Sequence, residues 1–362
     1  MKILQYDFRK SACRTMRCRP SGLTLVELLV VVSIMSILLA VSVPAIRPML
    51  ETQKTRNAAD TVSTFLSQAR LRAMETGLPC GVRFERYTGL QFQEGTGVVV
   101  YMYNGACLQM RQVAVPRPYG GCTEVSRLSV NNTGVITLDS MESVFWGEND
   151  NCIVRSGDQI QFDYQGPRYG LAISGTSVSI NWQQFDPASP GKNLTQVPFK
   201  VYRQPRPTLA APVRFPQGVV IDLNASGSTD EFAALNENDL KHVTIMFLPN
   251  GEVDYVDSSI GGKNTDNNPI FLCVGLWDRM KVWIKDSTND YNLSTDYLPE
   301  ETPPRLNYED LNNFWVTVFP KTGAITVQPV AAPNAGGTPP TPLEALEASR
   351  AHAKDIQAIG GR

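Results

Sequence analysis

Histidine is almost absent from this sequence, which has only His242 and His352 among its 362 residues. Histidine is the commonest metal ligand and a frequent general base, so its scarcity argues against a metal centre. We expect His242 to be an ordinary residue at the end of a strand. The sequence also has no nucleophile elbow, no paired catalytic carboxylates and no phosphate-binding glycine loop. We therefore expect no enzymatic activity, no metal site and no cofactor.

Charge is almost missing from one long stretch. Residues 23–43 form an apolar run of 21 residues in which Glu27 is the only charged side chain. A helix of that length measures roughly 31 Å, enough to cross a bilayer core of about 30 Å. A carboxylate at that depth costs roughly 2.5–3.5 kcal/mol, so Glu27 needs a partner. Cleavage after Gly22 would supply one, the new α-amino group of Leu23.

The segment Gly22-Leu23-Thr24-Leu25-Val26-Glu27 resembles the processing site of type IV prepilins and type II secretion pseudopilins. In that family the leader ends in glycine and glutamate is the fifth mature residue, whereas Leu23 stands here in place of the usual phenylalanine. The resemblance implies cleavage between Gly22 and Leu23 by a prepilin peptidase, which also methylates the amino group of Leu23. It further implies assembly with other pilin or pseudopilin subunits through a helix that contains Glu27 and a kinking proline, Pro44.

Two other interpretations of the apolar run are a secretory signal peptide and a plain single-pass anchor. A signal peptide would be cleaved near Ala40-Val41-Ser42, which has the required small residues. However, 21 apolar residues are long for a signal-peptide core, and a signal peptide gives no reason for Glu27. The prepilin interpretation accounts for both features.

The charges before the run predict its topology. Residues 1–22, the leader, contain six basic residues and one acidic residue, Asp7, so the leader should stay in the cytoplasm. The rest of the chain would face the periplasmic side of a bacterial inner membrane. Without the leader, 27 basic and 34 acidic residues give a net charge of about −7. An acidic mature chain argues against nucleic acid as a partner.

The residues after the apolar run predict that the helix continues to Thr76. Small and apolar side chains recur at spacings of three and four residues, at Ala58, Val62, Phe65, Leu66, Ala69 and Ala73. Gly77 and Pro79 provide the stop signal. One helix over residues 23–76, kinked near Pro44, would place its first half in the membrane or filament core. Its second half would pack on a head domain.

Residues 80–330 are expected to form this head, because short runs of β-forming residues alternate there with turn signals. Two hairpins are indicated by Asn250-Gly251 and Lys321-Thr322-Gly323, each between two such runs. Together with Ser67-Gln68-Ala69-Arg70 in the helix, these units are similar to the H-type minor pseudopilins and FimT-like pilins. Some 250 residues are about twice the size of a compact pseudopilin head, so we expect an insertion or a second lobe.

Cysteine pairing is permitted if the head is exported. Of seven cysteines, Cys13 and Cys18 would leave with the leader, and the remaining five have no zinc-type spacing. Connectivity cannot be read from sequence alone. The pair Cys107 and Cys122 is the economical choice, and at least one thiol stays single.

Two further segments have alternative interpretations. Asp286, Asn289 and Asp290 offer oxygen ligands to a cation such as Ca²⁺, but a polar loop rich in turn-formers is the simpler interpretation. Residues 331–342 are a Pro/Gly linker, and residues 343–362 form an amphipathic helix or tail. This tail would be either solvated or docked on a neighbouring subunit.

The sequence as a whole predicts an α+β protein, with a long kinked N-terminal transmembrane helix packed on an antiparallel, β-rich, sandwich-like head. The expected function is structural, as a minor subunit of a type II secretion pseudopilus or a type IV pilus. One alternative is a DNA-binding competence or FimT-like pilin, although Arg111, Arg117 and Arg127 are dispersed along the sequence. The other alternative is a monomeric, membrane-anchored surface protein.

Overall fold

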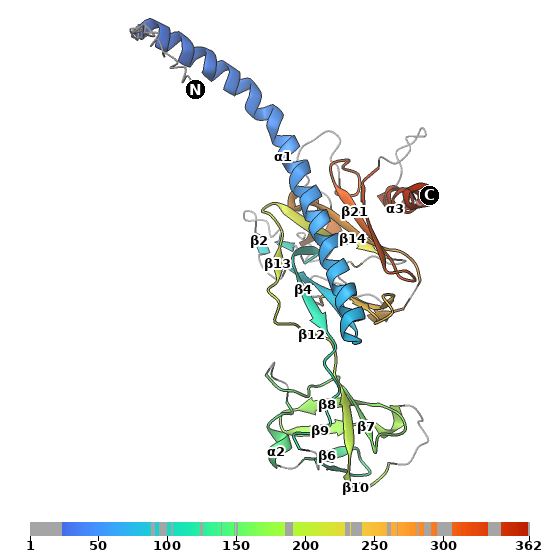
Figure 1. Ribbon diagram of the computed structural model, residues 1–362. Coiled ribbons are helices and arrows are strands. Elements are labelled where there is room, and N and C mark those ends of the chain that lie inside the picture. Colours follow the sequence, from blue (N-terminus) through green and yellow to red (C-terminus); the bar gives the residue numbers. More distant parts are fainter. Residues whose placement is uncertain are drawn as a thin grey trace, which may run out of the picture. The chain divides into compact units, whose positions relative to one another are not determined.

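The structure is a computed structural model of the chain (Figure 1). The residues that it describes are 24–87, 91–93, 100–102, 104–123, 126–138, 140–147, 149, 151–184, 191–228, 232, 241–258, 262–265, 267–280, 282–285, 291–294, 306–331 and 342–360. The chain divides into two compact units after Glu51, and each unit is described by itself.

The first element is the long helix α1 (Leu25–Thr76), as the sequence predicts. Its C-terminal end follows from one glycine. Gly77 has a φ of +65°, and its N–H donates to the carbonyl of Ala73 at 3.1 Å. Glycine adopts this left-handed conformation without the clash that a Cβ would cause, so the expected stop at Gly77 is confirmed.

The body of the second unit is an antiparallel sheet of eleven strands in the order β17-β16-β15-β1-β4-β14-β18-β21-β22, with β12 and β13 also paired to β4. Both predicted hairpins are confirmed, as β15–β16 and β21–β22. The strands are β1 (Cys80–Arg86), β4 (Ala106–Ala114), β12 (Arg206–Pro207), β13 (Val213–Arg214), β14 (Val219–Gly227), β15 (Val243–Phe247), β16 (Val253–Ser258), β17 (Gly262–Asn264), β18 (Ile270–Leu276), β21 (Phe314–Phe319) and β22 (Ala324–Pro329).

The body sheet packs against one face of the second half of α1. The predicted apolar stripe on the helix is confirmed, because its residues share one core with β1, β4, β14, β15, β18 and β21. At the far ends of the sheet, the N–H of Val253 donates to the carbonyl of Pro320 at 2.9 Å. The curled sheet therefore brings its two outer hairpins into contact. The buried stripe consists of Ala58, Val62, Leu66, Ala69 and Ala73, with Phe65 partly buried beside them.

A second lobe, residues 119–202, is inserted between β4 and β12. Its seven strands lie in the order β10-β5-β6-β9-β8-β7-β11. The two outer strands, β10 and β11, are consecutive in the chain and are joined by Pro198 alone, so the sheet curls round its own core. The elements are β5 (Leu128–Val130), β6 (Val135–Thr137), α2 (Ser140–Ser143), β7 (Gln159–Phe162), β8 (Tyr169–Ser174), β9 (Ser177–Ile180), η1 (Trp182–Gln184), β10 (Leu194–Val197) and β11 (Phe199–Tyr202).

One turn of this lobe has an unusual backbone. The turn between β7 and β8 places two consecutive non-glycine residues in the left-handed region, Asp163 at φ 52° and Tyr164 at φ 56°. The N–H of Gln165 donates to the carbonyl of Phe162 at 3.1 Å and closes the turn. Turns of this kind prefer Asn-Gly, and a left-handed residue with a Cβ costs about 1–2 kcal/mol. Tyr164 therefore occupies a position that its own side chain disfavours.

The remaining elements are a small sheet and a C-terminal helix. The small sheet has the order β2-β3-β19-β20. Its strands are β2 (Gln91–Gln93), β3 (Val100–Met102), β19 (Val282–Lys285) and β20 (Tyr291–Ser294), and a short helix, η2 (Trp277–Arg279), precedes β19. The helix α3 (Pro342–Gly360) lies against β21 and β22.

The tail interacts with its own chain. The indole N–H of Trp315 on β21 donates to Ser349 Oγ at 2.9 Å, and Arg350 Nη2 donates to the carbonyl of Ala225 at 2.7 Å. Ala345, Leu346 and Ala353 are buried in the same cluster as Trp315. The described part of the tail is therefore packed on its own chain rather than solvated, and docking on another subunit stays a prediction.

The predicted α+β class with antiparallel sheets is confirmed, but a sandwich-like head is wrong. Two sheets of a sandwich share one core between their inner faces. Here the body core contains the helix stripe, whereas the lobe has a separate core around Trp146, Ile160 and Phe199. The long helix fills the position that a second sheet would occupy.

Candidate processing and assembly segment

Glu27 closes the first turn of α1. The Thr24 hydroxyl accepts the N–H of Glu27 at 3.2 Å. In return, one carboxylate oxygen of Glu27 accepts both the N–H and the hydroxyl of Thr24, each at 3.1 Å. This reciprocal pair is a capping box, in which residues at the N-cap and three positions later satisfy each other's backbone donors. The sequence showed it as Thr-x-x-Glu before an apolar run, a pattern that the sequence analysis missed.

The other predicted residues of this segment are described only in part. Gly22 and Leu23 lie outside the described residues, so cleavage and methylation there stay predictions. The α1 backbone is helical through Pro44, whose side chain lies outside the description. The kink expected at Pro44 also stays a prediction.

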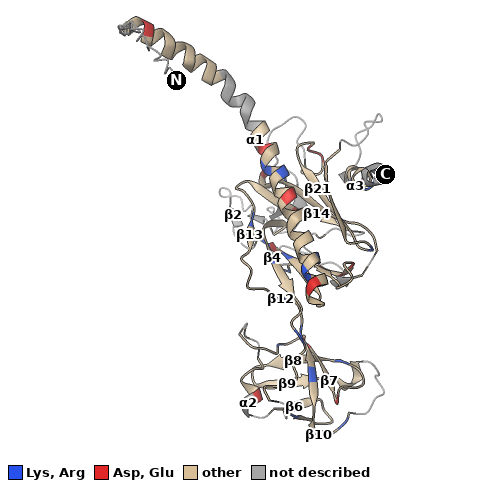
Figure 2. Cartoon of the chain, in the orientation of Figure 1, with Lys and Arg blue, Asp and Glu red and all other residues tan. Residues whose placement is uncertain are grey.

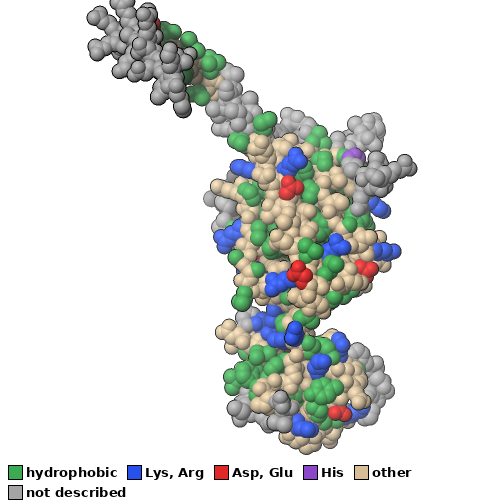
Figure 3. Space-filling view, in the orientation of Figure 1, with side chains coloured by type: hydrophobic (Ala, Val, Ile, Leu, Met, Phe, Trp, Pro, Cys, Tyr) green, Lys and Arg blue, Asp and Glu red, His purple; other side chains and the backbone are tan. Residues whose placement is uncertain are grey.

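The described start of α1 exposes its apolar side chains. Leu25 is 80% exposed and Leu39 is 62% exposed, with large aliphatic residues between them also exposed. The hydroxyls of Ser33 and Ser36 donate to the carbonyls of Val30 and Val32 within the helix, so these polar groups need no water. Glu27 is the one charged position in residues 24–40 (Figure 2), and hydrophobic side chains line this segment (Figure 3). An exposed apolar surface of this kind indicates a partner or a membrane.

None of the described helices is long and apolar enough to cross a membrane.

Residues 17–43 match the family profile described as the prokaryotic N-terminal methylation motif. This match supports a place in the type IV pilin and pseudopilin family. It points to a pilin-like precursor that a prepilin peptidase processes and that assembles with other pilins. No curated protein and no solved structure matches the chain. The comparison therefore concerns the N-terminal segment alone.

Arg70 on α1 binds both predicted hairpin turns at once. Its Nε donates to the carbonyl of Gly251 at 3.1 Å, and its Nη2 donates to the carbonyl of Thr322 at 2.8 Å. Gly323 lies so close that a Cβ there would come within 1.9 Å of the Gly251 oxygen. One guanidinium thus holds together the two ends of the body sheet. The sequence placed Arg70 on the helix but gave no sign of this role.

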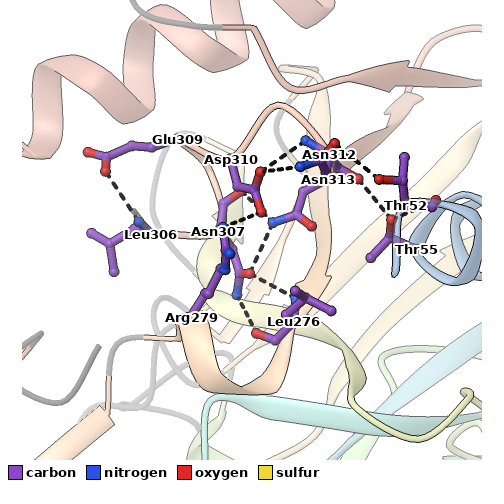
Figure 4. A network of polar contacts seen from close by, with 10 residues as sticks. All are labelled: Thr52, Thr55, Leu276, Arg279, Leu306, Asn307, Glu309, Asp310, Asn312 and Asn313. Carbon is purple, nitrogen blue, oxygen red and sulfur yellow. Dashed lines mark hydrogen bonds and ion pairs between the residues drawn. The ribbon is translucent and has the colours of Figure 1, made fainter. Parts of the chain in front are cut away.

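A second attachment of the helix involves a loop just before β21 (Figure 4). Thr55 Oγ1 donates to the carbonyl of Asn312 at 2.8 Å, and Thr52 Oγ1 donates to Asn312 Oδ1 at 3.0 Å. Asp310 holds this loop in place, because its Oδ1 accepts the backbone N–H of Asn312 and its Oδ2 pairs with Arg279 at 2.5 Å. The loop therefore docks α1 through hydrogen bonds.

Asn307 anchors the same loop in the interior. Its amide donates to Asp222 Oδ2 at 3.0 Å, and its Oδ1 accepts the N–H of Leu276 at 2.9 Å. A Cβ on Gly275 would lie 2.3 Å from that oxygen, so glycine is required for the approach. An asparagine-rich segment predicts a surface loop, and nothing in the sequence distinguishes a buried amide such as that of Asn307 from an exposed one.

Asp158 fixes the point where the chain leaves the lobe. Its carboxylate, almost wholly buried, accepts the backbone N–H groups of Arg155 and Gln204 and pairs with Arg206 at 3.1 Å. Arg206 Nη1 also donates to the carbonyl of Cys152 at 2.9 Å. Burial lowers the pKa of Arg206, and Asp158 opposes that shift. A partly desolvated guanidinium thus links β12 to the lobe.

The predicted disulfide between Cys107 and Cys122 is absent. All five described cysteines are free thiols. Cys107 is fully buried in the body core, where burial raises its pKa to about 12, whereas Cys122 is exposed in the lobe. Cys107 lies on β4 before the chain enters the lobe, and its thiol donates to the carbonyl of Gln109 at 3.1 Å. The two cysteines are close in the sequence but lie in different parts of the fold, so sequence separation was a poor guide to their pairing.

The other candidate residues do not form a site. His242 lies just before β15, where its Nδ1 accepts the N–H of Arg86 at 3.2 Å, and burial followed by the charge of Arg83 lowers its pKa. Arg111 pairs with Glu85, and Arg127 donates to a backbone carbonyl. Among the described residues, no group of histidine, cysteine and acidic side chains could hold a metal ion. The cation loop over residues 286–290 lies outside the description.

Proposed function

We propose that this chain is a minor pilin-like subunit with a structural role. A prepilin peptidase would cleave it between Gly22 and Leu23 and methylate Leu23. The mature chain would stay in the bacterial inner membrane through one helix, with its head in the periplasm, until it enters a type II secretion pseudopilus or a type IV pilus.

The observation that carries this proposal is the N-terminal segment. The methylation motif covers residues 17–43, and within it residues 25–40 form a helix that exposes apolar side chains and carries Glu27 in its first turn. Exposed apolar side chains of this kind are stable in place only when lipid or other helices cover them. Membrane storage followed by filament assembly provides both environments.

Two observations support the finer assignments. The two hairpins held by Arg70 favour the H-type and FimT-like group, because they place strand-turn-strand units beside the helix. The inserted lobe favours a minor subunit, because a bulky head would crowd its own copies at the short axial spacing of a filament. No arrangement of Arg111, Arg117 and Arg127 favours the DNA-binding alternative, since two of them bond within the chain.

The experiment that tests the proposal is mass spectrometry of the chain purified from membranes of its host. We expect a mature N-terminus at Leu23 that carries a methyl group. A start at Val43 would instead establish a signal peptide, and an intact leader would establish a plain anchor. Quantitative mass spectrometry of sheared filaments should find this chain as a rare component, and finding it as the most abundant subunit would contradict the minor assignment.

Glu27→Gln tests the charge at this position without removing the cap, because glutamine also closes a capping box. If Glu27 pairs with the amino group of Leu23 on its own or a neighbouring subunit, Glu27→Gln should be cleaved and inserted normally but should enter filaments poorly. Thr24→Val is the matched control, because it removes the cap and keeps the charge. Normal assembly of Glu27→Gln would favour the membrane-anchored monomer.

A further inference from the structure

The body contains a pocket that is lined by residues of β1, β4 and β13 and by His242. Its volume is about 560 Å³, within the range of roughly 300–1,000 Å³ that small-molecule sites occupy. His242 is a candidate residue of the sequence, whereas the other lining residues were not singled out there. The pocket therefore brings together side chains whose proximity the sequence does not show.

A bulge in β4 shapes this pocket. Glu85 lies opposite Gln109 in the ladder between β1 and β4, but the next residue, Arg86, lies opposite Cys107. Leu108 is therefore an extra residue of β4, and bulges of this kind redirect side chains. In a regular strand Leu108 and Gln109 would point to opposite faces, whereas both line the pocket. The bulge thus places an apolar and a polar residue side by side.

The carboxylate of the pocket is already engaged. One oxygen of Glu85 pairs with Arg111 at 2.9 Å, and the other accepts the side-chain amide of Gln109. Gln109 Oε1 in turn accepts from Arg214 Nε at 3.1 Å. Because both oxygens of Glu85 are bound within the chain, the pocket offers little to a cation.

Two hydrogen-bond donors of the pocket remain open to a ligand. Arg214 is exposed and uses Nε for Gln109, which leaves its two terminal amino groups. His242 Nδ1 accepts the N–H of Arg86 at 3.2 Å, so Nε2 carries the proton of the neutral ring and can donate. Among the described residues, neither group has a further hydrogen-bond partner. The pocket therefore suits a ligand that accepts hydrogen bonds.

The charges that act on His242 are mainly positive. Burial, and then the charge of Arg83, lowers the pKa of His242; Arg86 acts in the same direction and Glu85 opposes it. The Arg86 guanidinium also donates to two backbone carbonyls, at 2.5 and 3.1 Å, which fixes its charge in place. A fixed excess of positive charge attracts an anion.

We propose that this pocket binds a small organic acid with one carboxylate and an apolar body. The carboxylate would accept from Arg214, whose paired donors match its two oxygens, and from His242. The apolar body would lie against Leu108 and Tyr87, whose ring packs edge-on against Trp277 at a centroid distance of 5.1 Å. A bare anion such as phosphate would fill only a small part of the pocket and would leave this apolar wall uncovered.

Histidine signals report on this pocket directly, because the chain has only His242 and His352. NMR of the purified full-length protein in detergent, with isotope-labelled histidine, would follow both rings while phenylacetate is added. We expect a saturable shift of the His242 signal, no change at His352, and a dissociation constant of about 1 mM or below. The bound carboxylate should also raise the pKa of His242, because a nearby negative charge favours the protonated ring.

Two comparisons test recognition of the carboxylate. Phenylacetamide has nearly the same shape without the charge, and it should bind the unaltered protein about tenfold more weakly or worse. Arg214→Met removes an exposed guanidinium and should weaken phenylacetate binding by a similar factor. Arg56→Met is the matched control, because Arg56 is also an exposed arginine but does not line the pocket. It should leave binding unchanged.

Several results would overturn the proposal. A His242 signal that phenylacetate leaves unchanged would exclude the site. Equal binding of phenylacetate and phenylacetamide would exclude recognition of the charge, and this comparison does not depend on the folding of any variant. Equal binding by the unaltered protein and by Arg214→Met would exclude Arg214 as the anchor. Tighter binding of inorganic phosphate than of phenylacetate would overturn the choice of an organic acid.

Discussion

The two halves of α1 differ in the size of their apolar side chains and in whether those side chains are buried. From Leu25 to Leu39 the helix carries large aliphatic residues that are about half or more exposed. From Ala58 to Ala73 its inward face carries mostly small residues that are completely buried. Large residues suit an interface that is still to be made, whereas small residues let a curled sheet approach the helix closely. In one helix, the second half is therefore already packed on the body, whereas the apolar side chains of the first half have no covering surface within the described residues.

The largest effect is expected where the two hairpin turns of the body meet beside α1. Gly323→Ala would bring a Cβ to 1.9 Å from the Gly251 oxygen at a φ of +61°. We expect a loss of about 3 kcal/mol or more in the free energy of unfolding, from backbone strain and overpacking together. Denaturant unfolding of the full-length protein in detergent measures it. Gly77→Ala is the control, because Gly77 has nearly the same φ, +65°, but open space around it, and it should cost about 1 kcal/mol.

Enlarging a residue of the buried stripe should come next. Ala69→Leu adds three carbons to a fully buried site, and we expect a loss of about 2–3 kcal/mol in the free energy of unfolding. Leu29→Ala makes the opposite change in the exposed half, where Leu29 is 61% exposed. It should change the stability of the isolated chain by no more than about 0.5 kcal/mol and should instead reduce assembly. Equal destabilisation by the two variants would contradict the difference between the halves.

Removing the guanidinium that joins the two hairpins should have a moderate effect. Arg70→Met loses the hydrogen bonds to the carbonyls of Gly251 and Thr322, and we expect a cost of about 1–2 kcal/mol. Hydrogen exchange should increase at both turns together, because one side chain holds both. Arg56→Met is the control on an exposed position of the same helix and should have little effect. Faster exchange at one turn only would show that Arg70 does not couple them.

The smallest effect is expected at the start of the exposed half. Thr24→Val removes the capping box and should cost about 1 kcal/mol of local helix stability. Hydrogen exchange of the first helical amides measures this loss, which should not reach the body. Glu27→Gln keeps an acceptor for the Thr24 N–H and should show little change in the same measurement. If Glu27→Gln frays the helix as much as Thr24→Val, the charge rather than the hydrogen bond stabilises this turn.

Local patterns in the sequence predicted the parts of the fold that depend on near neighbours. The stripe from Ala58 to Ala73, the stop at Gly77 and both hairpin turns were readable because spacing and turn chemistry act over a few residues. The approach of the two hairpins to each other was not readable, because it depends on contacts such as that between Val253 and Pro320. These join residues that are far apart in the sequence.

The candidate site was predicted with similar limits. The motif around Glu27 was found because its residues are contiguous, yet the cap by Thr24 was missed, since the apolar run already accounted for that segment. Asn307 and Asp222 are 85 residues apart, and a buried amide has the same sequence signature as one in a surface loop. The Asp163-Tyr164 turn was missed for a different reason, because its sequence contradicts the preference of its own backbone.

The position of the inserted lobe has a consequence for how this protein can vary. The chain leaves β4 at Ala114 and returns at Arg206, and these two residues are partners in the ladder between β4 and β12. Residues 115–205 therefore leave the sheet and return to it at one pair of neighbouring residues, Ala114 and Arg206. Replacing them by a tight turn would leave every other strand pair of the body in register. Evolution could therefore exchange this module for another while the long helix and the strand pairing of the body stay the same.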